Sequence, residues 1–150
     1  MDLIEKLAAI EEIKALKARY WRAVDSKDLE LLRSVFADED CEIDMRNPTG
    51  PNTGGAVVHD PDAFSKNCLR ALADYTTAHH GHNPEIDILS PTEATGNWPM
   101  EDRLWLNEGA KGVGFEYLHG WGNYHDRYRK TEKGWKISFT NLQRSRVDKR

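Results

Sequence analysis

The feature that most limits the fold of this chain is a change in hydrophobic spacing along it. The N-terminal part repeats apolar residues in steps of three and four, which predicts one amphipathic helix over residues 3–24. Its predicted inner face consists of Leu7, Ile10, Ile13, Leu16, Tyr20 and Val24. Four later segments are rich in strand-forming residues, which predicts strands at 76–89, 93–106, 113–128 and 135–146. Helices first and long strands later are typical of an α+β domain with an antiparallel sheet.

Shorter signals fill the remaining chain. Asp28 is a good N-cap for a second helix that ends near residue 37, and Asp60 before a proline predicts the start of a third. A short strand is expected at 41–45, and the prolines and glycines of 47–55 predict a loop. The polar segment 131–134 predicts a hairpin turn between the last two strands.

A long antiparallel sheet with helices on one face can curl into a cone, which leaves a pocket between the two layers. Such a pocket is a natural site for a small molecule. With 150 residues the chain has the length of one domain, so we expect a single domain over residues 1–150 with one core.

Composition removes several classes of function. A net charge of −4 gives no electrostatic footprint for nucleic acid. Since no apolar run reaches the ~20 residues of a bilayer span, and the chain opens on a charged amphipathic segment, we expect no membrane and a cytoplasmic protein. The glycines around residue 112 do not precede a helix, so we expect no nucleotide cofactor. Cys41 and Cys68 have no histidine neighbour and are interpreted as buried fillers.

Asp102 is the most informative single position. The even residues of its strand form an apolar face, with Trp98, Met100 and Leu104, and Asp102 interrupts it. A carboxylate on an inner face costs free energy unless it is paired or hydrogen-bonded, and such paired acids gather at functional sites. The competing interpretation is a satisfied structural carboxylate, or a bulge that turns it outward.

Three histidines follow in one strand, at 79, 80 and 82. They do not share a face, because His80 and His82 point one way and His79 the other, so we expect no metal site. One of them is expected to face the pocket as a general base, since the free pKa of imidazole lies near neutrality. Periodicity does not decide which one. Tyr20 is open to two interpretations: a core tyrosine, or a phenol that polarises a substrate oxygen.

The third long strand alternates aromatic and polar residues. One phase carries Phe115, Tyr117, His119, Trp121 and His125, a face suited to a hydrophobic ligand, although packing against the helices explains it equally well. In the last strand an inward Arg144 would need a carboxylate partner.

Two stretches resemble known proteins. Residues 9–20 (AIEEIKALKARY), followed by Asp25 and by 31–38 (LLRSVFAD), resemble the opening of SnoaL-like proteins, of the NTF2-like superfamily. Residues 79–86 (HHGHNPEI) with 94–103 (ATGNWPMEDR) resemble the bile acid 7α-dehydratase family and its scytalone-dehydratase-like relatives. The resemblance covers nearly the whole chain, but the loop at 47–55 and residues 117–121 depart from it, so no substrate is carried over.

The resemblance implies roles for particular residues. It assigns catalysis to Tyr20, to His79 rather than His80 or His82, and to Asp102 as the partner of His79. Asp25 and Arg144 match supporting positions, and we add Trp98, His119 and Trp121 as expected contacts of the substrate.

The resemblance also implies a reaction. We therefore expect a cofactor-independent dehydratase that acts on a hydrophobic hydroxylated carbonyl compound of a steroid-like or polycyclic kind. We also expect a homo-oligomer, either trimer or dimer. An isomerase is the first alternative, because it needs the same proton abstraction without a leaving group. A non-catalytic binding or assembly module is the second, because this fold serves many functions.

Overall fold

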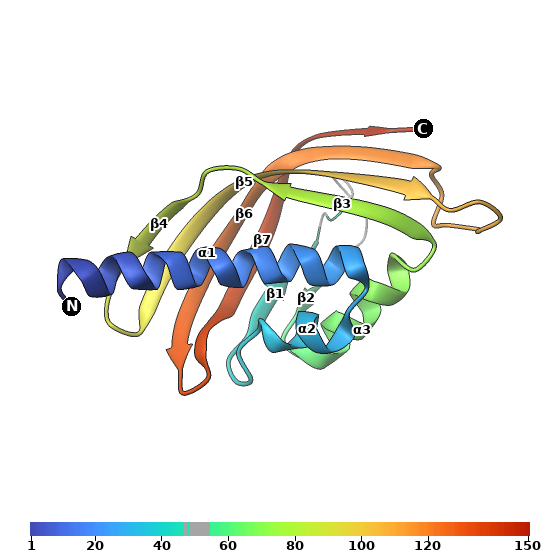
Figure 1. Cartoon of the computed structure of the whole chain (residues 1–150). Helices are drawn as coiled ribbons and strands as arrows, with labels where there is room; N and C mark the ends of the chain where they lie inside the picture. The colour runs from blue at the N-terminus through green and yellow to red at the C-terminus, as the bar shows by residue number, and fades with distance from the viewer. Residues whose placement is uncertain (47, 49–54) are drawn as a thin grey trace.

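A computed structural model describes residues 1–46, 48 and 55–150 of the chain. It is an α+β fold in which three helices lie against one face of a curved, open sheet of seven strands (Figure 1). The helices are α1 (Leu3–Ser26), α2 (Leu29–Ser34) and α3 (Pro61–Ala71). The strands are β1 (Glu42–Asp44), β2 (Val57–Val58), β3 (Tyr75–Gly81), β4 (Glu85–Ile88), β5 (Glu93–Leu106), β6 (Tyr117–Thr131) and β7 (Gly134–Lys149).

Each helix begins where the side chains can cap it. Asp2 and Glu5 form a capping box at the start of α1, and Asp28 accepts a backbone hydrogen bond at the start of α2. The predicted start of the third helix is also confirmed, since Asp60 caps α3 and a proline occupies its first position. The second helix is shorter than predicted: it ends at Ser34, and Val35 caps it.

The sheet order is β2-β1-β7-β6-β5-β3, with β4 also paired to β5. The predicted curved sheet is confirmed and its strand pairs are mostly antiparallel, but β1 runs parallel to β7, with Ile43 opposite Thr140. A three-residue strand has no pattern that reveals the direction of its neighbour, and the long connection between the two permits either direction. The sheet is therefore mixed, and its long strands β5, β6 and β7 are antiparallel.

The strands depart from their predicted bounds most clearly at two places. The segment 76–89 forms two strands, because the chain leaves β3 after Gly81 and the His82 N–H donates to the Pro99 carbonyl oxygen at 2.8 Å. The third long strand begins at Tyr117, because Gly112 and Gly114 adopt left-handed φ angles of 64° and 104° in the turn before it. The predicted loop at 47–55 lies almost entirely outside the described residues.

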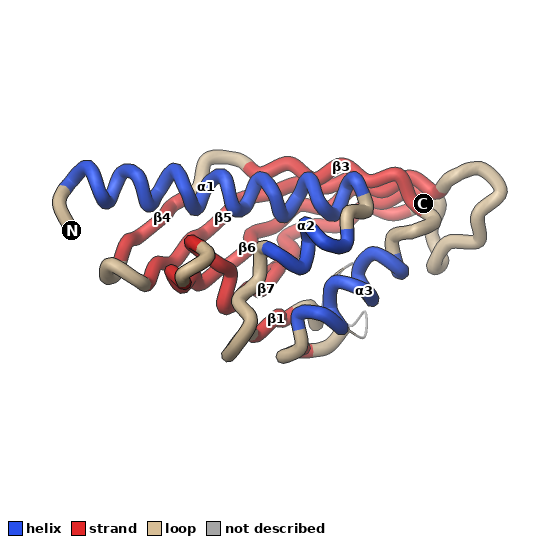
Figure 2. Tube along the Cα trace, turned by 60° about the horizontal axis from the view of Figure 1, so that its bottom comes forward, coloured by secondary structure: helices blue, strands red, loops and turns tan. Residues whose placement is uncertain are grey.

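Helix α1 lies along the sheet and provides much of the core (Figure 2). We call the sheet face that α1 covers the inner face. Most of the predicted stripe of α1 is buried on it, but Leu7 is 54% exposed, since the first turns of α1 reach past β4 (Figure 1). Within the described residues, no helix is both long enough and apolar enough to span a membrane.

Candidate active site

His79 and Asp102 face each other on the inner face. Residues of β3 and β5 pair antiparallel with His79 directly opposite Asp102. The side chain of His79 is 8% exposed and that of Asp102 is 2% exposed, and His79 Nε2 lies 3.6 Å from Asp102 Oδ2. The predicted inward direction of Asp102 is confirmed by its burial alongside the other even residues of β5.

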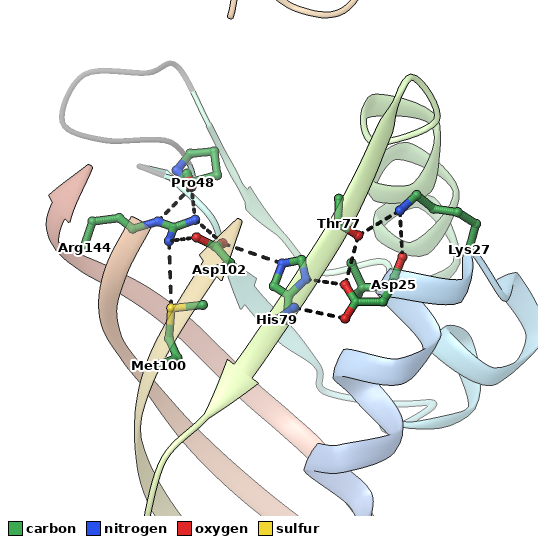
Figure 3. A network of polar contacts seen from close by, with 9 residues as sticks. Asp25, Lys27, Pro48, Thr77, His79, Met100, Asp102 and Arg144 are labelled. Carbon is green, nitrogen blue, oxygen red and sulfur yellow. Dashed lines mark hydrogen bonds and ion pairs between the residues drawn. The ribbon is translucent and has the colours of Figure 1, made fainter. Parts of the chain in front are cut away.

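The hydrogen-bonded partner of the imidazole is Asp25, at the end of α1. His79 Nδ1 lies 2.6 Å from Asp25 Oδ1, and the backbone N–H of His79 donates to Asp25 Oδ2 at 3.0 Å (Figure 3). We expected Asp102 to orient the ring, but its distance from Nε2 exceeds that of a hydrogen bond. Asp25 therefore fixes both the ring and the backbone that carries it, which ties the last turn of α1 to β3.

Two further side chains support Asp25. Thr77 Oγ1 donates to Asp25 Oδ1 at 2.9 Å, and Lys27 Nζ donates to Thr77 Oγ1 at 2.9 Å. Lys27 caps α1 in the left-handed conformation, with φ 58°, which brings its side chain back toward the helix end. Neither residue was predicted from the sequence, although Thr77 shares the strand phase of His79.

On the other side of His79, Arg144 holds Asp102 in a bidentate ion pair. Both guanidinium NH₂ groups donate to the two Asp102 oxygens at 2.7 Å (Figure 3). The pair lies above Gly120, where a Cβ atom would come within 2.3 Å of the guanidinium and 2.6 Å of the carboxylate. Glycine at this position of β6 thus makes room for the ion pair.

The ion pairs shift the pKa values of the charged groups. Partial burial raises the pKa of Asp25, but the hydrogen bonds from His79 and Thr77 outweigh it and hold the pKa below its ordinary value. Burial opposes the charge of Arg144, and the hydrogen bonds to Asp102 nevertheless raise its pKa. Both groups are therefore charged at neutral pH, one on each side of His79.

Tyr20 lies next to a second phenol that the sequence analysis missed. Its ring packs edge-on against Tyr124 at 5.8 Å and against Phe36 at 6.0 Å between centroids. Burial raises the pKa of both phenols. Both phenols are therefore neutral at neutral pH.

The inner phase of β6 is the opposite of the one we favoured for ligand contacts. His119 and Trp121 point to the outer face, where His119 Nε2 lies 2.8 Å from Glu101 Oε2 and the two rings stack at 3.7 Å. The even positions face inward instead, including Tyr124. The prediction failed because two inward positions, Gly120 and Gly122, are glycines and leave the aromatic residues on the outer phase.

The other expected residues are divided between core and surface. Trp98 is buried as predicted, and it lies four residues before Asp102 on β5. Its Nε1 donates to the Tyr128 hydroxyl at 2.7 Å. His80 pairs across the sheet with Glu101, on the side away from His79. Within the described residues no cluster of three or more His, Cys, Asp and Glu side chains is arranged to hold a metal ion.

Comparison with known proteins gives the family. The model of the SnoaL-like domain matches residues 5–141. The chain belongs to the SnoaL-like domain family. The match includes the end of α1 with Asp25 and the two strands that carry His79 and Asp102, but not Arg144.

Solved structures share the fold of this SnoaL-like domain. The Kfla4162 protein of Kribbella flavida superposes with a TM-score of 0.83 at 23% identity, covering 95% of each chain. A proposed scytalone dehydratase from Novosphingobium aromaticivorans gives 0.80 at 22% identity over 98% of this chain and 91% of that one. A hexachlorocyclohexane dehydrochlorinase from Novosphingobium barchaimii gives 0.79 at 17% identity over 99% and 94%. At these identities the likeness establishes the fold.

Proposed function

We propose that this SnoaL-like domain is a cofactor-independent hydro-lyase that removes water from a small hydrophobic hydroxylated carbonyl compound. The observation that carries the proposal is the 2.6 Å contact between His79 Nδ1 and Asp25 Oδ1. Because Nδ1 donates its proton to a carboxylate, the neutral imidazole has its lone pair on Nε2, the nitrogen that faces Asp102. This arrangement directs Nε2, as a general base, toward Asp102 on the inner face of the sheet.

The proton transfers follow from this geometry. His79 Nε2 removes a proton from the carbon next to the substrate carbonyl, and the electron pair moves into an enolate. The imidazolium then lies between Asp25 and Asp102, and these two carboxylates stabilise its charge. As the enolate re-forms the carbonyl group, the carbon–oxygen bond to the hydroxyl breaks and Nε2–H returns its proton, so that water leaves. A positioned acid–base group of this kind contributes about 10²–10⁴-fold to the rate.

Phenols are the best candidates for stabilising the enolate oxygen. Tyr20 and Tyr124 are neutral donors at neutral pH, because burial raises the pKa of both. We assign Tyr20 the hydrogen bond to the carbonyl oxygen, with Tyr124 beside it. The aromatic contacts of Tyr20 with Phe36, and of Phe36 with Phe64, favour a hydrophobic substrate.

The compared structures support an elimination reaction. Two of them are named as a dehydrochlorinase and as a proposed scytalone dehydratase, and both names describe loss of a small molecule from an organic substrate. Proton abstraction by a histidine is compatible with either chemistry, so these names support the class of reaction and leave the substrate to experiment.

The test compares two neighbouring histidines on opposite faces of β3. A panel of cyclic β-hydroxyketones is incubated with the wild-type protein and with His79→Gln and His80→Gln, and products are measured by mass spectrometry. We expect loss of one water from at least one compound, a rate at least about 10²-fold lower in His79→Gln, and an unchanged rate in His80→Gln.

Other outcomes assign the alternatives. A product of unchanged mass that also depends on His79 would identify an isomerase. Folded His79→Gln protein that retains the wild-type rate would overturn the assignment of the base. If no compound in a broad panel is converted, the non-catalytic binding module becomes the better interpretation.

A further inference from the structure

Arg144 has every donor of its guanidinium group occupied within the protein. Besides the two bonds to Asp102, Nε and one NH₂ group donate to the Pro48 carbonyl oxygen at 3.0 and 2.8 Å, and the other NH₂ group contacts the Met100 sulfur at 3.8 Å (Figure 3). A guanidinium group has five N–H donors. These contacts use all five, so none remains to bind an acidic substrate group.

We infer that the site selects uncharged substrates, because Asp102 and Pro48 already occupy the arginine that would otherwise attract an anion. This inference rests on the proposed function, since it concerns the ligand of the same site. It also identifies Asp102 as the carboxylate partner that an inward Arg144 was expected to need. The guanidinium group of Arg144 fixes this carboxylate.

The charges around His79 act in the same direction. Asp25 and Asp102 place a carboxylate near each ring nitrogen, and Arg144 neutralises only one of them. The ammonium group of Lys27 donates to Thr77 beside Asp25 and to the Val24 carbonyl oxygen, so its hydrogen bonds are also made within the protein. A carboxylate or phosphate brought next to His79 Nε2 would therefore meet negative charge first.

Binding of an anion to the guanidinium group of Arg144 requires an unfavourable change in the protein. To bind there the anion must displace Asp102, whose side chain is 2% exposed and whose two oxygens both accept from Arg144. The displaced carboxylate would then be buried without a partner, which is strongly unfavourable. A neutral carbonyl compound avoids this exchange, since the two phenols can hydrogen-bond its oxygen.

The test measures binding and requires no turnover. Benzamide and benzoate are matched in shape and differ in charge at pH 8. Each is titrated into protein labelled with ¹⁵N-histidine, and the dissociation constant is taken from the shift of the His79 Nε2 resonance, which localises binding to this site. The resonance is assigned by its loss in His79→Gln.

Two variants change one carboxylate each on adjacent residues of β5. Asp102→Asn removes the charge that neutralises Arg144, whereas Glu101→Gln removes the same charge from the outer face, where Glu101 pairs with His119. We expect wild type to bind benzamide at least tenfold more tightly than benzoate. The ratio of the benzoate to the benzamide dissociation constant should fall at least tenfold in Asp102→Asn and be unchanged in Glu101→Gln. Asp102→Ala is the second variant if the asparagine variant does not fold.

The inference is overturned if wild type binds benzoate as well as benzamide. It is also overturned if the Asp102 variants gain no affinity for benzoate, including the case in which wild type binds neither probe. The two proposals fail separately. A protein that prefers benzamide but converts no compound contradicts only the proposed function, and an active enzyme that accepts benzoate contradicts only this inference.

Discussion

Two buried ion pairs lie on the same inner face of the sheet and differ in what they leave available. Lys17 and Asp126 form one, with a 2.7 Å contact and both side chains 0% exposed. Arg144 and Asp102 form the other, also at 2.7 Å, with side chains 5% and 2% exposed. Distance and burial are nearly equal, so these properties alone do not distinguish a structural pair from a functional one.

The surroundings of the first pair close it off. Asp126 also accepts hydrogen bonds from the Tyr128 hydroxyl at 2.7 Å and from Thr140 Oγ1 at 2.6 Å. The Lys17 ammonium lies over the Tyr124 ring, 3.8 Å from its centroid, and 4.7 Å from the Tyr20 centroid. The pair is therefore enclosed by hydrogen-bond partners and aromatic rings, which indicates a structural role.

The second pair is next to a group that can carry a proton. Its carboxylate stands 3.6 Å from His79 Nε2, too far for a hydrogen bond and near enough to stabilise a positive charge on the ring. The two pairs therefore differ in one respect that matters for chemistry. The Arg144–Asp102 pair lies next to a ring nitrogen, His79 Nε2, to which Asp102 makes no hydrogen bond.

The largest effect is expected from removing the Lys17 ammonium. Lys17→Met leaves Asp126 buried without its cation, which should lower the free energy of unfolding by about 3–5 kcal/mol. Adding Asp126→Asn removes the stranded charge and should restore a large part of the loss. Urea unfolding of the single and double variants measures both. A double variant as unstable as Lys17→Met would show that packing, rather than charge, holds this region together.

The two pairs also show what sequence reasoning can reach. The alternation of side chains along a strand predicted that Asp102 faces inward, because Met100 and Leu104 mark the buried face. Lys17 was overlooked, although it stands four residues after Ile13 and so falls on the same helix face. Asp126 was overlooked because the phase of β6 was taken from its aromatic residues.

Contacts between residues far apart in the sequence could not be predicted from hydrophobic periodicity. Asp25 by itself reads as a helix-end residue, and its contact with His79 exists only because the end of α1 lies against β3. The family resemblance named both residues, but it paired His79 with Asp102. Arg144 holds Asp102 in a bidentate ion pair, and the room for this pair depends on Gly120, two strands away from His79.

A smaller effect is expected from one threonine in each network. Thr140→Val removes a hydroxyl that is hydrogen-bonded to buried Asp126, at a cost of about 1.5–3 kcal/mol in the free energy of unfolding. Thr77→Val removes the same kind of bond to Asp25, whose side chain is 29% exposed, so water can replace it and the cost should be about 1 kcal/mol or less.

The same two variants should differ in their effect on His79 and on turnover. Thr77→Val weakens the support of Asp25, so the His79 Nδ1 resonance should move, and turnover of any accepted substrate should fall by roughly the few-fold that corresponds to 1 kcal/mol. Thr140→Val should leave both unchanged. Valine keeps the shape and strand preference of threonine, so the hydroxyl is the main difference. If Thr140→Val moves the His79 resonance as much as Thr77→Val does, the two networks are coupled and the distinction between them fails.

The smallest effect is expected in acid, from Asp25. The hydrogen bonds from His79 and Thr77 hold the folded-state pKa of Asp25 below its ordinary 3.8. A carboxyl group that binds protons more weakly in the folded than in the unfolded state contributes stability that is fully present above the unfolded pKa and is lost as the pH falls through the folded pKa. The free energy of unfolding of wild type relative to Asp25→Asn should therefore be constant above about pH 5 and decline below pH 4. Urea unfolding across pH 2–7 measures this difference, and a difference that instead declines between pH 5 and 7 would locate the titrating group elsewhere.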